Sequence, residues 1–421
     1  MKLNRCKFLY LVSSAACAAI ATPALAQQKV VTRPLGTITA VSTDSIGARV
    51  AIRALSNGKV LVNDIVRRRV LLFDESLKSY KVVMDSASSG GSNAAIPVSL
   101  PSAQLITYTG DSTLYVDMSS MSLLVLDPTG KVAHVMALPR PRDAFFLGSG
   151  INFGTPVMDA KGRLVYRGVI VNLPKPPEPG ATPTFSMPEQ PDSAPIVRAD
   201  FDTRKVDTLI TMKVLKPGSM NMVTDKEGNM TMKITMNPVD TGDEWAMITD
   251  GSIAIVRAHD YHIDWLDADG TRRSTPKMPF DWKRLTDERK QFMIDSLRPE
   301  LEKQLAATTA NLPMIPTANG MRKLKIAFDF LPPAKMADYE PSVSPGSVRA
   351  DLDNNVWILP RTAAGTGSGG VVYDIVNHKG EVTERVQLPK GRALAGFGAG
   401  GVVYLLNTDG KSALLERARL R

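Results

Sequence analysis

Two histidines three residues apart are the part of this sequence best suited to chemistry. His259 and His262 stand in the stretch DGSIAIVRAHDYHIDWLDADG, residues 250–270, with Asp260 between them. Imidazole nitrogens and carboxylate oxygens are the ligands that zinc prefers. A zinc site needs one or two more ligands, and no fixed spacing in the chain points to them. We therefore predict no cofactor and interpret the stretch as a polar turn, with calcium or zinc left open.

Three consecutive arginines form the second candidate group. Adjacent guanidinium groups repel one another and suit a carboxylate or phosphate ligand, although a solvated turn is the simpler interpretation. With the histidine turn they make up the candidate ligand-binding set: Arg67, Arg68, Arg69, His259, Asp260, Tyr261 and His262. No residue is assigned a catalytic role.

Three other functional motifs are excluded, either by the residues around them or because the sequence lacks them. A calcium-binding EF-hand loop ending in DADG would begin at Trp265, which cannot be its first oxygen ligand. The glycine-rich stretch GFGAGG, residues 396–401, precedes VVYLLN, a strand pattern, whereas a dinucleotide site needs a helix there. The G-x-S-x-G elbow of serine hydrolases is absent from the sequence. A Ser-His-Asp site built from distant segments stays open.

An internal repeat supplies the elements that carry these residues. The segments LDPTGKVAHVMALP (126–139), LDADGTRRSTPKMP (266–279) and VNHKGEVTERVQLP (376–389) share one interval between glycine and proline. The alignment extends upstream into two short apolar runs. Related copies bring the total to six, which predicts a repeat architecture.

Each copy contains two runs of Val, Leu, Ile and Tyr separated by a polar turn, and such runs read as strands. The runs are nearly continuous, as in LLVL and VVYLL, which indicates burial on both faces of a sheet. The intervals are too short for the helices that parallel strands would need. Small antiparallel sheets covered on both faces are the blades of a β-propeller. We predict an all-β, six-bladed β-propeller over residues 27–421.

With these strand pairs and the turns Asp127–Gly130, Asp267–Gly270 and Asn377–Gly380, the chain resembles the six-bladed TolB-like or NHL-like propellers of bacterial envelope proteins. The resemblance brings no catalytic motif. It implies four-stranded blades in which the repeated pair forms the second and third strands. It also implies that turns between those strands share a face with the crossings from blade to blade.

Two insertions interrupt the predicted repeats. Residues 172–195 are rich in proline, and residues 280–345 contain one helical pattern, at 286–313, which Pro299 is expected to break or kink. Both insertions, with the glycine-rich stretch 362–370, are expected on one face. Because scaffolds carry function on loops, we take this loop-rich face as the predicted binding surface.

The first residues predict export. Residues 1–26 combine a basic head, an apolar middle and the cleavage pattern Ala24-Leu25-Ala26 of a secretory signal peptide. Both cysteines, Cys6 and Cys17, fall inside it, so the mature chain would have no disulfide and no thiolate ligand. The net charge of +9 is spread along the chain. We expect a periplasmic or extracellular protein, free or associated with a membrane, and no transmembrane segment in its mature chain.

These features favour an exported, non-enzymatic binding or scaffold propeller of the cell envelope. Its partner would be an envelope protein or an acidic glycan or lipid surface on the loop-rich face, and export argues against nucleic acid. The alternative is a metal-dependent lactonase or esterase, because some six-bladed propellers hold a cation in the central channel with Glu, Asp and Asn. Asp351 and Asp353 lie near an expected innermost strand. Whether the protein is an enzyme stays open, with the non-enzymatic hypothesis preferred.

Overall fold

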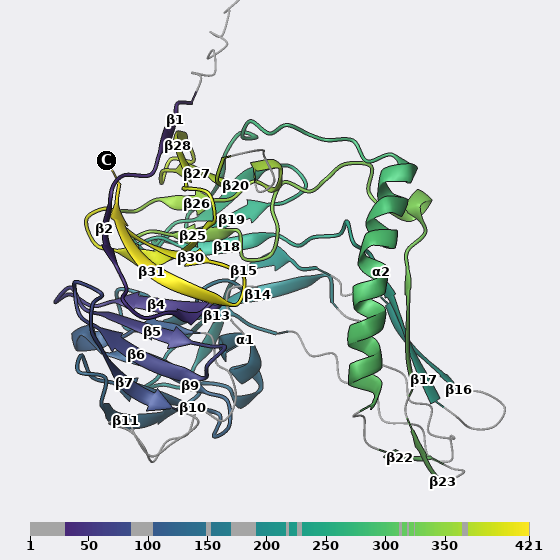
Figure 1. The fold of residues 1–421 in the computed structure, drawn as a ribbon, viewed down its shortest axis with the longest axis horizontal. Helices are drawn as coiled ribbons and strands as arrows, with labels where there is room; N and C mark the ends of the chain where they lie inside the picture. Colours follow the sequence, from purple (N-terminus) through teal and green to yellow (C-terminus); the bar gives the residue numbers. More distant parts are fainter. Residues whose placement is uncertain are drawn as a thin grey trace, which may run out of the picture.

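The computed structural model describes residues 30–85, 104–148, 153–169, 191–215, 219–224, 230–310, 314–317, 320–323, 325–363 and 369–420. The predicted signal peptide and most of the proline-rich insertion lie outside these residues. Six antiparallel sheets follow one another along the chain, each led by an innermost strand. The predicted all-β, six-bladed propeller is confirmed (Figure 1).

The first three blades have four strands each, named in order from the innermost strand outward. Blade 1 contains β4 (Val50–Ala54), β5 (Val60–Asp64), β6 (Arg69–Phe73) and β7 (Tyr80–Asp85). Blade 2 contains β8 (Leu105–Thr107), β9 (Thr113–Asp117), β10 (Ser122–Leu126) and β11 (Val132–Ala137). Blade 3 contains β12 (Val157–Met158), β13 (Leu164–Arg167), β14 (Ser193–Ala199) and β15 (Val206–Lys213).

The last three blades repeat this order. Blade 4 contains β18 (Glu244–Met247), β19 (Ile253–Arg257), β20 (His262–Leu266) and β21 (Arg272–Ser274). Blade 5 contains β25 (Val348–Ala350), β26 (Val356–Ile358), β27 (Val372–Val376) and β28 (Val382–Gln387). Blade 6 contains β29 (Arg392–Gly398), β30 (Val402–Thr408) and β31 (Ser412–Arg419) from the end of the chain. The repeated apolar pair forms the second and third strands of every blade.

The N-terminal segment closes the ring. Strand β2 (Ile38–Val41) pairs antiparallel with β31 and becomes the outer strand of blade 6, as predicted. The short β3 (Ile46–Gly47) also pairs with β31. The sequence did not predict β1 (Thr32–Pro34), which adds a fifth, parallel strand outside β28 of blade 5. The first described strands thus hold the last two blades together.

The aspartate side chains stabilise the Asp-x-x-Gly turns by accepting hydrogen bonds from the backbone of the turn. Asp127 Oδ1 accepts hydrogen bonds from the backbone N–H groups of Thr129 (2.8 Å) and Lys131 (3.0 Å). Gly130 has a φ of +82°, where a side chain is strained. An aspartate or asparagine with a glycine three residues later therefore specifies the bend from the third strand to the fourth.

A lobe outside the ring is built from two crossings. Between blades 3 and 4 the chain forms β16 (Ser219–Thr224) and β17 (Met230–Met236), which the sequence did not predict. Between blades 4 and 5 it forms α2 (Asp287–Ala310), the hairpin β22 (Met314–Thr317) and β23 (Gly320–Lys323), and β24 (Lys325–Phe330). Strand β24 pairs in parallel with β17, which joins the crossings into one lobe beside the propeller (Figure 1).

The predicted helix is present, but its expected interruption is wrong. Helix α2 runs through Pro299 without a break. Proline removes one backbone donor and crowds the preceding turn. Pro299 lies on the exposed side of the helix, where water can satisfy the freed carbonyl. In the part of the chain that the structure describes, neither helix combines the length and apolarity of a membrane span.

Candidate functional site

The turn that carries His259, Asp260 and Tyr261 joins β19 to β20 in blade 4. Tyr261 is fully buried, with a φ of +49°, and its hydroxyl donates a 2.7 Å hydrogen bond to Asp374 Oδ2 in blade 5. Arg385 donates to the other oxygen of the same carboxylate at 2.8 Å. Tyr261 therefore links two blades and offers no surface to a ligand.

The polar neighbours of Tyr261 engage separate partners. His259 Nε2 lies 3.1 Å from Lys213 Nζ, Asp260 pairs with Lys277 at 2.9 Å, and His262 Nε2 lies 3.4 Å from Asp264 Oδ1. The described ranges contain no group of three or more His, Cys, Asp or Glu side chains that could hold a metal. The structure thus gives the two histidines different contacts.

We expect the variant His259→Ala/His262→Ala to keep the metal content and fold of the parent protein. Both imidazoles have nearby protein partners, and neither faces a preformed cluster of ligands. Elemental mass spectrometry and a thermal scan of both proteins, purified without chelators, check this. Bound zinc or calcium that disappears in the double variant would contradict it.

The arginine group occupies the equivalent turn of blade 1, between β5 and β6. Arg67 and Arg69 both approach Asp64 Oδ2, at 3.9 and 3.4 Å, and Asp64 is completely buried. Arg68 has a φ of +53°. In a ring of six, blades 1 and 4 lie opposite each other, so the structure does not bring the two candidate groups together.

A different cluster lies where blades 3 and 4 meet on the loop-rich face, and the sequence did not predict it. Glu244 begins β18, the innermost strand of blade 4, and is only 6% exposed. One oxygen accepts a 2.8 Å hydrogen bond from the N–H of Gly346. Among the residues described, no cation lies within ion-pair distance of its carboxyl group.

The surroundings of Glu244 favour its neutral form. Burial raises the pKa of this carboxyl from its ordinary 4.5 to about 8, although the Gly346 hydrogen bond and the charge of Arg167 act in the opposite direction. At neutral pH the group therefore retains its proton. A carboxylic acid that stays protonated at pH 7 can donate a proton, the property required of a general acid.

Arg167 ends β13 beside this acid. Its guanidinium lies 4.7 Å from the ring centre of Phe153 and 5.8 Å from that of Phe146, in cation–π geometry. Its Nε is buried and has no hydrogen-bond partner among the residues that the structure describes. A buried donor without a partner is unusual in a folded protein and marks this position for a functional explanation.

Phe146 and Phe153 form an aromatic wall beside Arg167, and two sets of contacts hold it in place. Trp245 Nε1 donates to the carbonyl of Phe153 at 2.9 Å, and a Cβ on Gly154 would come within 2.0 Å of the same nitrogen. Asp143, which is fully buried, accepts hydrogen bonds from Tyr166 (2.6 Å) and Arg140 (2.7 Å) just before helix α1 (Ala144–Gly148). These contacts position the two phenylalanines over Arg167.

Asp351 and Asp353 directly follow the innermost strand β25, as expected, and their carboxylates shape a turn. Asp351 accepts hydrogen bonds from Trp357 Nε1 (3.0 Å) and from Asn355, and Asp353 accepts from the N–H of Gly401. Both follow β25, at the end of the strand opposite the loop-rich face. They shape the turn into β26 and connect it to blade 6.

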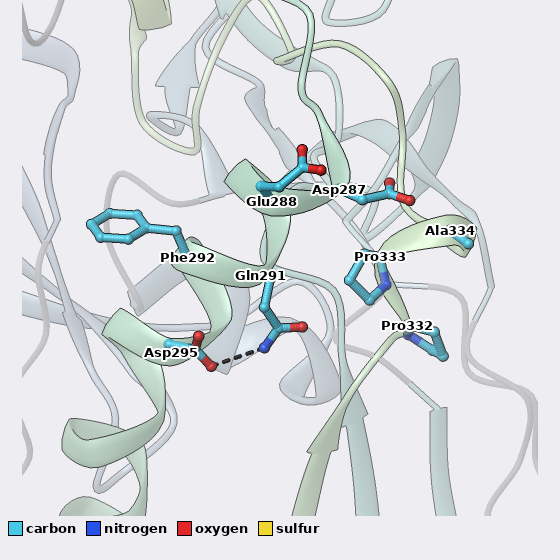
Figure 2. Close-up of a pocket in the computed structure, with 8 residues that line it drawn as sticks. All are labelled: Asp287, Glu288, Gln291, Phe292, Asp295, Pro332, Pro333 and Ala334. Atoms are coloured by element: carbon cyan, nitrogen blue, oxygen red, sulfur yellow. Dashed lines mark hydrogen bonds between the residues drawn. The ribbon is translucent and has the colours of Figure 1, made fainter.

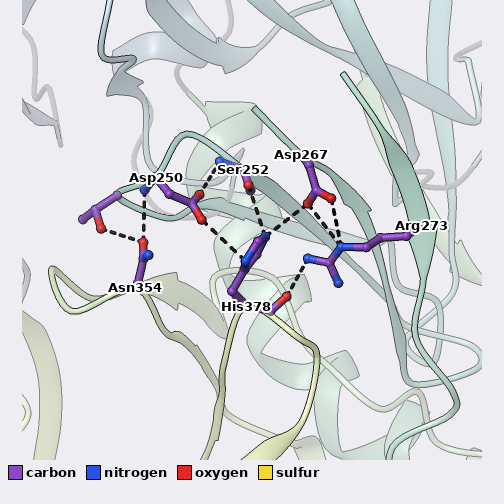
Figure 3. A network of polar contacts seen from close by, with 7 residues as sticks. Asp250, Ser252, Asp267, Arg273, Asn354 and His378 are labelled. Carbon is purple, nitrogen blue, oxygen red and sulfur yellow. Dashed lines mark hydrogen bonds and ion pairs between the residues drawn. The ribbon is translucent and has the colours of Figure 1, made fainter. Parts of the chain in front are cut away.

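A Ser-His-Asp set does assemble on this second face, between blades 4 and 5 (Figure 3). His378 Nε2 lies 3.4 Å from Ser252 Oγ, and its Nδ1 lies 3.7 Å from Asp250. However, Asp267 Oδ1 lies 3.2 Å from the same Nε2 and competes with the serine for it. Ser252 is also only 2% exposed. A serine nucleophile needs a free imidazole nitrogen and an accessible hydroxyl, and this set provides neither. We therefore interpret it as a structural contact between blades 4 and 5 and call it the clasp.

We expect His378→Ala and Ser252→Ala to leave any catalytic activity within about twofold of the parent. Because His378 is 43% exposed, its loss should lower the free energy of unfolding by less than about 1 kcal/mol. Burial tends to raise the pKa of Asp267, but hydrogen bonds from Arg273 and His378 outweigh it and the net pKa is lowered. The stabilisation from this carboxylate is therefore present above about pH 4 and is lost as the pH falls further.

Urea denaturation between pH 3 and 7, with activity assays, checks both expectations. Loss of activity in both alanine variants with the stability unchanged would show that the clasp is catalytic.

Comparisons with known proteins come from solved structures alone, since neither the family models nor the curated proteins match the chain. A gluconolactonase from Xanthomonas campestris is 12% identical, with a TM-score of 0.40, over 92% of this chain and 94% of that one. Virginiamycin B lyase from Staphylococcus aureus is 9% identical, with a TM-score of 0.41, over 91% and 99%. Regucalcin from Agrobacterium tumefaciens, a calcium-binding protein, is 11% identical, with a TM-score of 0.39, over 93% and 97%.

These similarities concern the propeller architecture. They correct the expectation of a non-enzymatic binding or scaffold module, because a lactonase and a lyase are among the propellers of similar architecture. At such low identity the neighbours do not assign an activity to this chain. The functional argument therefore depends on its own residues.

Proposed function

We propose that this protein is a propeller enzyme that hydrolyses an ester or lactone bond in a small molecule, at the junction of blades 3 and 4. The observation that carries the proposal is the juxtaposition of Glu244 with the buried Nε of Arg167. Among the described residues, the first has no ion-pair partner and the second no hydrogen-bond partner. Both lie on the loop-rich face, Glu244 at the start of an innermost strand.

The two groups suit the two demands of acyl–oxygen cleavage. Water adds to the acyl carbon, and negative charge develops on the carbonyl oxygen, which the Arg167 guanidinium stabilises. The bond to the leaving oxygen then breaks, and Glu244 delivers its proton to that oxygen. The proton lost by the attacking water restores Glu244, so that the products are an acid and an alcohol.

The aromatic wall supports a small organic substrate. Phe146 and Phe153 pack edge to face, with ring centres 5.1 Å apart, and Phe145, which is 55% exposed, continues the apolar surface outward. Ligand sites of this kind combine apolar walls with a few polar groups that fix orientation. We expect the acyl or alkoxy part of the substrate to contact these rings.

The residues present do not fit a lactonase-type cation. Among the described residues, the carboxylate that acts on Glu244 belongs to Asp243, which is already paired with Arg257. Across the described segments, no cluster of acidic and histidine side chains could enclose calcium or zinc. The mechanism therefore uses no metal, and we expect turnover to survive EDTA.

The test is a screen of the purified full-length chain against aryl esters and γ- and δ-lactones, followed by pH-stat titration, with and without EDTA. Turnover that saturates with substrate supports the proposal. A complete lack of turnover, or turnover that depends entirely on added calcium, would overturn it. Secretion, which residues 1–26 predict, is tested by the mass and cellular fraction of the mature chain.

A further inference from the structure

A hollow of about 650 Å³ lies on the lobe that Figure 1 shows beside the propeller ring, and Figure 2 shows the residues that line it. One wall is the first two turns of α2, and the other is the segment Pro332–Ala334. Three carboxylates and one exposed aromatic ring stand on the helix side. The lining residues are Asp287, Glu288, Gln291, Phe292, Asp295, Pro332, Pro333 and Ala334.

The two walls are held in place by one buried lysine. Lys290 is 1% exposed, and its ammonium group donates hydrogen bonds to the carbonyls of Pro333 (3.2 Å) and Met336 (3.3 Å). It also pairs with Asp338 at 2.9 Å and with Asp287 at 3.4 Å. The hollow is thus preformed, so a partner need not order it on binding.

The charge of the hollow identifies the kind of partner. No salt bridge engages Glu288 or Asp295 in the described structure, although the whole chain carries a net charge of +9. Asp295 accepts a hydrogen bond from Gln291 on the same helix face. Asp287 is already paired with Lys290, so Glu288 and Asp295 are the carboxylates that favour a cationic ligand. The exposed ring of Phe292 (59%) has the guanidinium of Arg289 5.2 Å from its centre, and with the two prolines it offers an apolar contact beside the charge.

The spacing favours a peptide over a single small cation. Glu288 and Asp295 are seven residues apart on one helix, which is roughly 10 Å along the axis. A polyproline-type peptide advances about 9 Å in three residues and returns to the same side. Two basic side chains three residues apart can therefore reach both carboxylates, with an apolar residue between them above the prolines.

We propose that this hollow is a docking site for a basic, proline-containing segment of another protein. The probe is the fluorescein-labelled peptide Gly-Arg-Pro-Leu-Arg-Pro-Gly, titrated against the full-length chain by fluorescence polarisation at low salt. Its counterpart with both arginines replaced by glutamate is the peptide control. We expect saturable binding of the basic peptide, weakened by salt, and no saturable binding of the acidic one.

The matched variants separate the hollow from general charge. Glu288→Gln/Asp295→Asn should weaken binding about fivefold, since exposed ion pairs contribute modestly. Glu300→Gln/Glu302→Gln removes the same charge from later turns of α2, outside the hollow, and should leave binding unchanged. Phe292→Ala should also weaken binding.

Equal weakening by both double variants, equal binding of both peptides or no saturable binding of the basic peptide would overturn the proposal. Catalytic turnover measured on the same preparations keeps this outcome distinct from failure of the proposed enzymatic function.

Discussion

The Glu244→Gln variant should lose at least about a hundredfold in kcat for ester or lactone hydrolysis, the typical effect of removing a general acid. Glutamine keeps the shape of the side chain and can still accept the hydrogen bond from Gly346. It cannot deliver a proton. Steady-state kinetics on the best substrate of the screen, with parent and variant side by side, measures the effect. A variant that retains more than a tenth of the parent kcat would show that Glu244 is not the proton donor.

The pH profile provides an independent readout of the same group. With a pKa of about 8, Glu244 is protonated through neutral pH, so kcat/KM should be level near pH 6–7 and fall above about pH 8. Arg167→Met should lower kcat but leave this limb in the profile, whereas Glu244→Gln should remove it. A rate that keeps rising through pH 9 would contradict the assigned role.

The same substitution should make the protein more stable in alkali. A carboxyl whose pKa is raised in the folded state costs stability as the pH rises from 4.5 toward 8. Glu244→Gln removes this cost, which is on the order of 5 kcal/mol at pH 9, and should change little at pH 4. Opposite effects on stability and activity are typical of a catalytic position and not of a structural one.

Trp357→Ala should destabilise the ring strongly, by about 3–5 kcal/mol. Trp357 lies completely buried in blade 5, and its ring contacts those of Tyr373 and Phe397, with centres 5.7 and 5.0 Å away. Its Nε1 also donates to the buried Asp351. Alanine would leave a cavity and remove a donor from this carboxylate, and both effects are costly.

The control is Trp282→Ala. Trp282 is 38% exposed on the crossing after blade 4 and contacts Phe280, so its loss should cost less than about 1 kcal/mol. Urea denaturation followed by circular dichroism compares the variants without relying on tryptophan fluorescence. Losses of similar size for the two variants would mean that packing between blades 5 and 6 does not dominate stability.

The repeat made the fold predictable from the sequence. Apolar pairs such as VLV and VLLF in blade 1 recur with the same turn residues, and each unit can bury its strands only against a neighbour. The pairing of β2 could be predicted because β31 is the third strand of blade 6 and has a free edge that a fourth strand can join. Strands β16 and β17 were missed because their methionine- and threonine-rich runs belong to no repeat, and β24, the parallel partner of β17, lies about a hundred residues away.

The candidate site could not be predicted from the sequence in the same way. The sequence drew attention to Tyr261 and to the arginines beside Asp64, and the structure uses both in contacts that hold the blades. Glu244 could not be recognised from the sequence. Its raised pKa results from burial by segments far along the chain, which leaves no motif around the residue itself.

By itself the sequence determined the class of fold, the number of blades, the closure of the ring and the position of the long helix. These depend on local patterns: periodic apolar runs and turns whose side chains bond to their own backbone. Only the tertiary structure decided that Arg167 and Glu244, from adjacent blades, lie near each other, with the Glu244 carboxyl and the Arg167 Nε withdrawn from water. Desolvation and unmet hydrogen bonds arise from three-dimensional packing, which one chain position cannot reveal.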